Sequence, residues 1–278
     1  MEHAVSERPT EARNPRAANL ESFTTRQILE LMNDEDATVP AAVRRAIGDI
    51  ERAVDAIVHA LSRGGHVIYI GAGTSGRLGV LDASEAPPTF GVEADMFHGV
   101  IAGGDGAIRS SVEGAEDEES AGRRDVAQIV RRDDVIVGIS ASGRAPYVLG
   151  GLEAGEHVAS KTVAITCNPG SPLALAADIA IVVDVGPEIL AGSSRLKAGT
   201  ATKLVLNMLS TAAMIRSGRT RGDLMVDLRA TNAKLRERAV RMVREVAGID
   251  EAAARARLEA NDWSVRRSLG PSEGEPRR

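Results

Sequence analysis

The sequence VIYIGAGTSGRLGVLDASEAPPTF, residues 67–90, decides the fold of this chain. Its first four residues are apolar, as in a strand that is buried on both faces of a parallel sheet. Glycines at 71, 73 and 76 then end the strand, and a helical pattern follows. A glycine-rich turn that leads into a helix presents free backbone N–H groups at the positive end of the helix dipole, and these groups bind anions. The sequence therefore predicts an anion site here, to which Thr74 and Ser75 would add hydroxyl donors.

The same glycines also fit the spacing G-x-G-x-x-G, which is typical of dinucleotide sites. That motif expects an acidic residue at the end of the second strand, about 20 residues further on. Asp95 lies near that distance, but it precedes the apolar residues of its strand instead of ending them. The pattern therefore favours a single phosphate over a dinucleotide, and a purely structural turn stays open.

Apolar runs alternate with helical patterns from here to about residue 215. We expect strands over residues 66–70, 95–101, 134–139, 161–166 and 178–183, and helices over 75–86, 111–130, 200–215 and from 146 onward. Pro87 and Pro88 should stop the first of these helices. Alternating strands and helices with continuously apolar strands predict an α/β fold, with a parallel five-stranded sheet that helices cover on both faces.

The two ends of the chain have different patterns. Residues 1–20 are polar and aperiodic, so we expect a flexible arm. A short helix over 24–34 and one long amphipathic helix from Pro40 to Leu61 should follow. After residue 220 the strands stop, and residues 228–247, 250–260 and 262–269 predict three helices. The domain division is then 1–20 arm, 21–220 main domain, 221–270 helical appendage and 271–278 disordered tail.

Composition excludes several classes of function. The net charge of −5 gives no general attraction to nucleic acid or anionic membranes, and six aromatic residues are few for base stacking. One cysteine, Cys167, excludes an internal disulfide and fits a reducing compartment, and its apolar neighbours favour a packed thiol over a nucleophile. The five histidines lack metal-ligand spacing, so we expect no metal. No membrane span or signal peptide is evident, so a cytoplasmic location is expected.

A second polar loop resembles the first in design. Ser140, Ser142 and Gly143 follow the third strand, as Thr74, Ser75 and Gly76 follow the first strand. Ligands of open α/β sheets bind at the carboxyl ends of the strands, so the two loops together predict a site for a phosphorylated small molecule. Ordinary helix capping by the serines is the alternative.

Charged residues offer further candidates. Glu85 lies next to the two prolines, and residues 113–119 form an acidic cluster that includes Glu116. Spacing alone cannot select one catalytic carboxylate from that cluster, which also suits a solvated helix start. Glu188 precedes a third polar loop, whose Lys197 could approach the same ligand or form ion pairs on the surface.

The two loops resemble those of a sugar isomerase (SIS) domain, a flavodoxin-like three-layer αβα sandwich that binds sugar phosphates. Longer blocks resemble the N-acetylmuramic acid 6-phosphate etherase family over roughly residues 12–269. These blocks are IGAGTSGRLGVLDASEAPPTFG, IAGG, EGAED, GISASGRAPYV, SSRLKAGTATKLVLNMLST and DLMVDLRATNAKLRERA. One departure is Ala86, which stands where a cysteine is expected after Glu85.

The resemblance implies a carbon–oxygen lyase that removes lactate by β-elimination and then adds water. The products are N-acetylglucosamine 6-phosphate and D-lactate, in the recycling of peptidoglycan sugars. Glu85 would be the general acid and Glu116 the second catalytic carboxylate. No cofactor is needed, because the carbonyl of the opened sugar accepts the electrons. The resemblance and two strongly apolar helices also predict a homodimer.

Two other functions stay open. The resemblance extends to the glucokinase regulatory protein, which keeps the fold as a non-catalytic sugar-phosphate sensor but has two such domains. A sugar-phosphate isomerase would share removal of the C2 proton. Release of lactate separates the etherase from both.

Overall fold

The computed structural model describes residues 9–156, 158–159, 161–228, 230 and 232–270. The chain forms two compact units, which we describe separately. The first contains the residues up to 84 and residues 95–213, and the second contains residues 85–94 and those from 214 onward. The second unit therefore starts slightly earlier than the expected boundary at 221, and it takes in a short segment from the middle of the chain.

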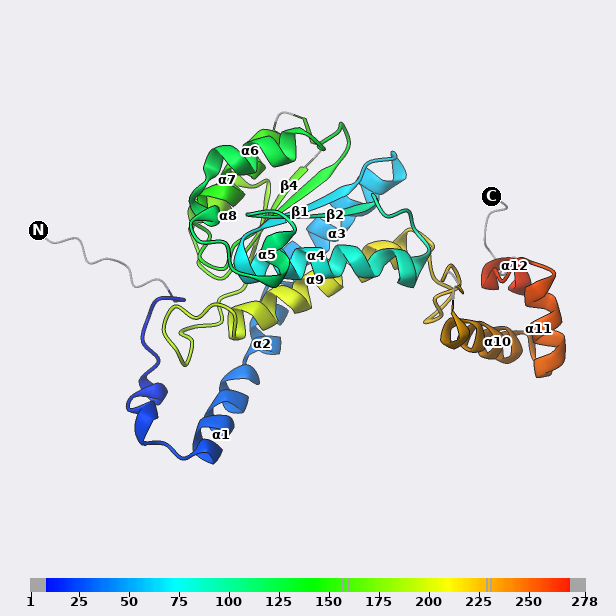
Figure 1. Ribbon diagram of the computed structural model, residues 1–278, viewed down its shortest axis with the longest axis horizontal. Helices are drawn as coiled ribbons and strands as arrows, with labels where there is room; N and C mark the ends of the chain where they lie inside the picture. The colour runs from blue at the N-terminus through cyan, green and yellow to red at the C-terminus, as the bar shows by residue number, and fades with distance from the viewer. Residues whose placement is uncertain (1–8, 157, 160, 229, 231, 271–278) are drawn as a thin grey trace, which may run out of the picture. The chain divides into compact units, whose positions relative to one another are not determined.

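The first unit is built on one sheet whose strands all run parallel (Figure 1). Its spatial order is β2-β1-β3-β4-β5, which is the flavodoxin-like order. The bounds are β1 Val67–Gly71, β2 Phe97–Ile101, β3 Val135–Ile139, β4 Lys161–Thr166 and β5 Ile179–Val182. The predicted parallel five-stranded sheet is confirmed. Chain order reverses between β1 and β3, so the two predicted phosphate loops leave neighbouring strands.

Helices cover both faces of this sheet (Figure 1). Ile68, Ile70 and Ile136 point to one face, where they form a buried core with residues of α7 and α8. The helices of that layer are α6 (Glu119–Ala127), α7 (Pro146–Glu156) and α8 (Pro172–Ala176). The other layer contains α3 (Ile47–Ser62), α4 (Gly73–Phe90) and α9 (Lys197–Arg216). The three-layer αβα sandwich is therefore confirmed.

A buried polar cluster joins the sheet to α4 and α9. The Tyr69 hydroxyl on β1 donates to Asp82 Oδ2 at 3.0 Å, and the Ser210 hydroxyl on α9 donates to Asp82 Oδ1 at 3.1 Å. Burial raises the pKa of Asp82, and it raises the pKa of Tyr69 well above its usual value. Each polar group has a hydrogen-bond partner, which offsets part of the desolvation penalty and fixes the two helices on the strand.

Several helices differ from the sequence expectation. The one expected over 111–130 is shorter, because Gly114 has φ +72° and only residues from Glu119 onward form α6. Helix α4 continues through both prolines and ends at Phe90, and the φ of +63° at the following Gly91 suits a C-terminal cap. The prolines lie in its last turns and lack the N–H groups that would donate to carbonyls four residues earlier, so the helix loses these bonds only close to its end. The long helix expected from Pro40 is divided into α2 (Val39–Arg45) and α3. The turn Gly106–Arg109 forms α5.

The N-terminal residues 9–20, expected within a flexible arm, contact the first unit. Thr10 is buried, and its hydroxyl accepts a hydrogen bond from Asn168 Nδ2 at 2.8 Å. Its carbonyl accepts from the Gly192 N–H at 3.1 Å. Two short 3₁₀ helices, Pro15–Ala17 and Leu20–Ser22, lead to α1 (Thr25–Asp36). Residues 1–8 lie outside the described residues, as does the tail 271–278.

The second unit has its own apolar core. It contains α10 (Ala233–Ala247), α11 (Glu251–Glu259) and α12 (Val265–Leu269), which pack around buried aliphatic side chains of all three helices and of the segment before them. An N-cap side chain precedes each helix and accepts a backbone hydrogen bond from its first turn; these residues are Asn232, Asp250 and Ser264. Three helices were expected here, and α10 begins five residues later than predicted.

Close packing of α6 on α7 predicts a strong effect of one glycine. A methyl group on Gly122 would overlap the carbonyl oxygen of Tyr147. We expect Gly122→Ala to lower the free energy of unfolding by about 1–3 kcal/mol, as over-packing does. The control is Gly48→Ala in α3, where nothing lies within 4 Å of the added methyl group. It should be neutral or stabilise by up to about 1 kcal/mol. Urea unfolding followed by circular dichroism measures both, and equal effects would contradict the packing explanation.

Candidate active site

The loop after β1 has the geometry of an anion site. Gly73 has φ +51° and begins α4, so Thr74 and Ser75 occupy its first turn. A side chain on Gly71 would come within 2.6 Å of the Gly76 nitrogen, so the turn is too tight for one. Within the described residues, the hydroxyls of Thr74 and Ser75 have no hydrogen-bond partner in the protein, and both residues are only half-buried. Both hydroxyls are therefore free to bind a ligand.

The loop after β3 is held mainly by its own hydrogen bonds. The Gly143 N–H donates to the Ser140 carbonyl at 2.9 Å and lies 3.1 Å from the Ser140 hydroxyl. The Ser142 hydroxyl accepts from the Arg144 N–H at 3.3 Å. Gly143 has φ +66°, and a methyl group there would overlap Ser171. Gly143 thus shapes the loop, and its N–H is already used inside it, which the sequence did not indicate.

Asn168 supports this loop from behind, although sequence reasoning did not select it. Its Nδ2 donates to the Ala141 carbonyl at 2.9 Å and to Thr10, while its Oδ1 is buried without a partner among the described residues. Its position just after β4, at the same edge of the sheet as the two loops, is the sequence feature that could have indicated this role.

The neighbouring Cys167 is buried, and burial raises its pKa to about 12. This supports a packed thiol over a nucleophile.

A cavity of about 180 Å³ places Glu116 beside the first loop. Its wall includes Gly73 from the start of α4, Arg77 one turn later, and Glu113 and Glu116 from the acidic cluster. The Arg77 Nε donates to the Ile108 carbonyl at 3.1 Å, which leaves its two terminal nitrogens for the cavity. The structure therefore brings a carboxylate and a cation together next to the anion site. Arg77 was missed, although it directly follows the quoted Gly-Thr-Ser-Gly motif.

Glu85 does not line this cavity. It is exposed on α4, eleven residues after Thr74, which is about 16 Å along the axis at 1.5 Å per residue. The structure therefore does not bring Glu85 to the cavity wall that carries Glu116.

Known proteins match this chain along nearly all of its length. The N-acetylmuramic acid 6-phosphate etherase of Aeromonas hydrophila is 54% identical over 254 residues, which cover 91% of this chain and 85% of that protein. The etherase of Salmonella typhimurium is 51% identical over 261 residues, which cover 94% and 88%. This chain belongs to the N-acetylmuramic acid 6-phosphate etherase family. As a family member it is a lyase, and its sheet carries the sugar-phosphate-binding fold.

Two domain families and several solved structures agree with the fold of this etherase family member. Residues 112–212 match the SIS domain, and residues 49–156 match the glucokinase regulatory protein N-terminal SIS domain. The phosphoheptose isomerase of Francisella tularensis is similar with a TM-score of 0.55 and 20% identity, over 69% of this chain and 100% of that one. The enzyme from Neisseria gonorrhoeae gives 0.53 and 17%, over 68% and 98%.

Glu188 and Lys197, expected near the ligand, are both buried inside the protein. The Glu188 carboxylate accepts hydrogen bonds from the N–H groups of Lys197 at 3.0 Å and Ala198 at 2.9 Å, so it caps the N-terminus of α9. Burial raises the pKa of Glu188, although these hydrogen bonds oppose the rise. The Lys197 ammonium donates to Glu35 Oε2 at 2.6 Å. Burial alone would raise the pKa of Glu35, but this hydrogen bond and the charges of Lys197 and Arg16 lower it.

These buried charges still act on the site through α9. A side chain on Gly199, two residues into this helix, would lie 3.6 Å from the Thr74 methyl group. The start of α9 thus packs against the first loop, and its cap helps to position that loop.

Among the described residues, no helix is long and apolar enough to cross a membrane, and no three His, Cys, Asp or Glu side chains gather as metal ligands.

The cap predicts a structural effect of Glu188→Gln. Glutamine has one acceptor oxygen for two N–H donors, and it lacks the charge that the helix dipole favours. We expect the free energy of unfolding to fall by about 1–3 kcal/mol. The exposed Glu21 is the matched control, since Glu21→Gln should change stability by less than about 0.5 kcal/mol. An unchanged urea midpoint for Glu188→Gln would show that the cap contributes nothing.

Proposed function

We propose that this chain cleaves the D-lactyl ether of N-acetylmuramate 6-phosphate and releases D-lactate and N-acetylglucosamine 6-phosphate. The observation that carries the proposal is 51–54% identity to etherases over about nine tenths of the chain. The candidate site supports it, because a hydroxyl-lined anion loop adjoins a cavity with a carboxylate. A cytoplasmic location remains part of the proposal; the single, buried cysteine is consistent with it.

The phosphate would bind at the two loops. Thr74 and Ser75 offer free hydroxyls at the start of α4, where Gly76 keeps the turn tight and its N–H donates to the Ala72 carbonyl at 3.2 Å. Ser140 and Ser142 lie on the neighbouring loop. Such remote binding energy orients the sugar without taking part in bond breaking. Arg77 lies on the wall of the cavity, where its guanidinium would suit the lactyl carboxylate of the substrate.

Glu116 would act as the base. Opening of the sugar ring exposes an aldehyde at C1, which makes the C2 proton acidic. Removal of that proton by Glu116 places negative charge on the enolate of the sugar, and the lactate oxygen at C3 can then leave. Water adds to C3 of the unsaturated aldehyde, and C2 regains a proton. The carbonyl of the substrate accepts the electrons, so the reaction needs no cofactor.

Glu85 would donate the proton that the leaving lactate oxygen needs. A carboxyl group that serves as an acid must stay protonated, and burial favours its neutral form. Glu85 is exposed in the single chain, so a second subunit has to supply both the burial and the rest of the site. Leu81, one turn earlier on the same face of α4, is 45% exposed, and Met208 on α9 is 36% exposed. These apolar side chains support a homodimer whose site combines Glu116 of one subunit with Glu85 of the other.

A non-catalytic sugar-phosphate sensor is the second candidate, because residues 49–156 match the regulatory-protein domain. The etherase and the sensor are both expected to bind a sugar phosphate. Only the etherase releases lactate, and an isomerase would interconvert aldose and ketose instead.

The first test is the overall reaction. We expect the purified chain to release D-lactate from N-acetylmuramate 6-phosphate without added metal or nucleotide, as measured with a coupled D-lactate dehydrogenase. The unphosphorylated sugar should react far more slowly, because the loop contacts are lost. Binding of the sugar phosphate without lactate release would favour the sensor. Equal rates for the two sugars would contradict the assignment of the loops.

Substitution of the two carboxylates should affect different steps of the reaction. In Glu85→Gln the base remains, so the C2 hydrogen should exchange with deuterium from solvent while lactate release falls by about 10²–10⁴-fold. In Glu116→Gln nothing starts the reaction, so both exchange and release should be lost. Mass spectrometry of the sugar follows the exchange. The opposite pattern would interchange the two roles, and full activity of either variant would remove that residue from the site.

A shared site makes one further prediction. Subunits carrying Glu85→Gln and Glu116→Gln, each inactive alone, should recover activity when they are co-expressed. A hybrid dimer then has one site with both substitutions and one with neither, so random pairing gives about a quarter of the wild-type activity. No recovery, with hybrid dimers shown by native mass spectrometry, would mean that both carboxylates act within one chain.

A further inference from the structure

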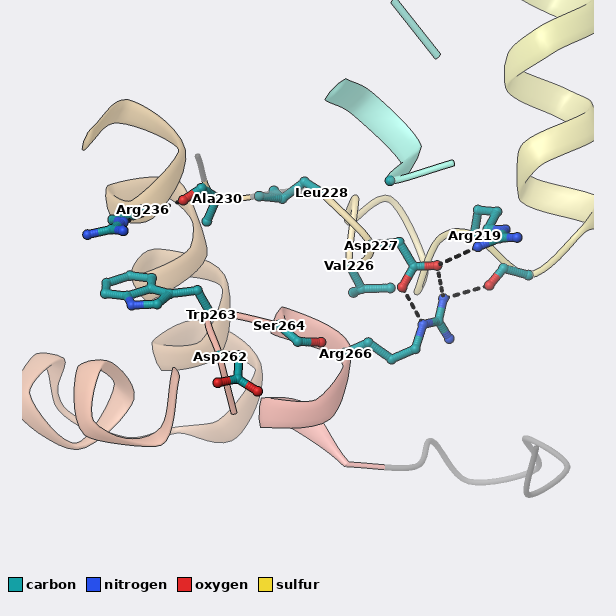
Figure 2. A pocket seen from close by; sticks show the side chains of 12 residues that line it. Arg219, Val226, Asp227, Leu228, Ala230, Arg236, Asp262, Trp263, Ser264 and Arg266 are labelled. Carbon is teal, nitrogen blue, oxygen red and sulfur yellow. Dashed lines mark hydrogen bonds and ion pairs between the residues drawn. The ribbon is translucent and has the colours of Figure 1, made fainter. Parts of the chain in front are cut away.

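The second unit contains a cavity of about 610 Å³ (Figure 2). Small-molecule sites typically measure roughly 300–1,000 Å³, so it is large enough for a sugar-sized ligand. None of the residues assigned to the proposed reaction lines it. The residues that the following paragraphs use are Arg219, Asp227, Arg236, Trp263, Ser264 and Arg266.

The wall carries more positive than negative charge. Three arginines and two aspartates line the cavity. Asp227 accepts two hydrogen bonds from Arg266, at 2.5 and 3.0 Å, and the second aspartate, Asp262, pairs with Arg267 outside the cavity. Arg219 approaches Asp227 only to 3.9 Å. Its guanidinium is therefore available to an anion. The Arg236 Nε donates to the Ala230 carbonyl at 3.4 Å, which leaves its two terminal nitrogens.

The side of the cavity opposite this cluster is aromatic (Figure 2). Arg236 lies over the Trp263 ring at 4.8 Å from its centre. Asp262 and Trp263 have φ angles of +50° and +59°, in a left-handed region that residues other than glycine seldom adopt. The backbone N–H of Trp263 holds this turn by donating to the Leu258 carbonyl at 2.8 Å. An unusual backbone thus keeps the ring on the wall of the cavity.

We propose that this cavity binds an anionic hexose, with its phosphate or carboxylate on Arg219 and its ring against Trp263. Guanidinium groups recognise both kinds of anion with paired N–H donors. A sugar ring has an apolar face for the indole and for the neighbouring Val226 and Leu228, and hydroxyls for Ser264 and Asp227. The proposal does not depend on the etherase reaction.

Trp263 makes the test specific, since it is the only tryptophan of the chain. Its fluorescence is followed while glucose 6-phosphate, glucuronate, neutral glucose or inorganic phosphate is added to the full-length protein. We expect a saturable change with the two anionic sugars and a much weaker one with glucose or phosphate alone. Arg219→Gln should weaken binding about tenfold or more, because a charge-assisted hydrogen bond is lost. This variant keeps the Arg266–Asp227 pair, and circular dichroism checks its fold.

Two control variants separate this site from others. Arg241→Gln removes an exposed arginine of α10 that does not line the cavity, and it should bind like the wild type. Ser142→Ala alters the loop of the first unit and should leave the fluorescence response unchanged. Calorimetry with Arg236→Gln gives a second measurement, which should also show weaker binding.

Three results would overturn the proposal. They are no saturable response to either anionic sugar, equal affinity of Arg219→Gln and the wild type, and loss of the response in Ser142→Ala. An equal response to inorganic phosphate would replace it with a simple anion site. The fluorescence test stands whether or not lactate is released, so its failure is distinct from failure of the proposed function.

Discussion

Parallel pairing of β1 with β3 is the constraint on which the site depends. Gly71 lies opposite Ile139, so the two strands end together and their loops leave the same edge of the sheet. The chain order reverses at this point, which opens the space that ligands occupy in such folds. The cavity with Glu116 lies next to the first of these loops. A shift of one residue in this pairing would turn the strand side chains to the wrong faces and separate the loops.

A series of paired charges, which begins at the exposed Arg16 and continues inside the protein, joins the N-terminal segment to the start of α9. Arg16 pairs with Glu35, Glu35 pairs with Lys197, and Glu188 caps the helix that Lys197 begins. A buried charge is tolerated only when it is paired and hydrogen-bonded, so removing one member leaves the next one without compensation. Residues far apart in the sequence are thereby held against α9, whose first turn packs on the Thr74 loop. This explains why two charged residues of the third polar loop support the site from inside instead of facing a ligand.

The two proposed catalytic carboxylates differ in their surroundings. Both are exposed, but Glu116 lines a cavity with Arg77 and the start of α4, whereas Glu85 lies several turns further along that helix and does not line it. A base works as an ionised, accessible carboxylate, but an acid has to keep its proton. In the proposed mechanism one chain would provide the base and the phosphate site, and a second subunit would supply the burial that the acid requires. In the proposed dimer, assembly and catalysis depend on each other for this reason.

The sequence by itself determined the local features of this protein. Continuous apolar runs predicted all five strands, and longer motifs indicated the family. Both predictions are confirmed, because each depends on neighbouring residues. That the two glycine- and serine-rich loops bind an anion stays a prediction. Only the tertiary structure decided that Gly143 shapes its loop, that Thr10 and Asn168 support it, and that Glu188 and Lys197 are buried. Each of these depends on a partner far away in the chain, which neither periodicity nor motif spacing encodes.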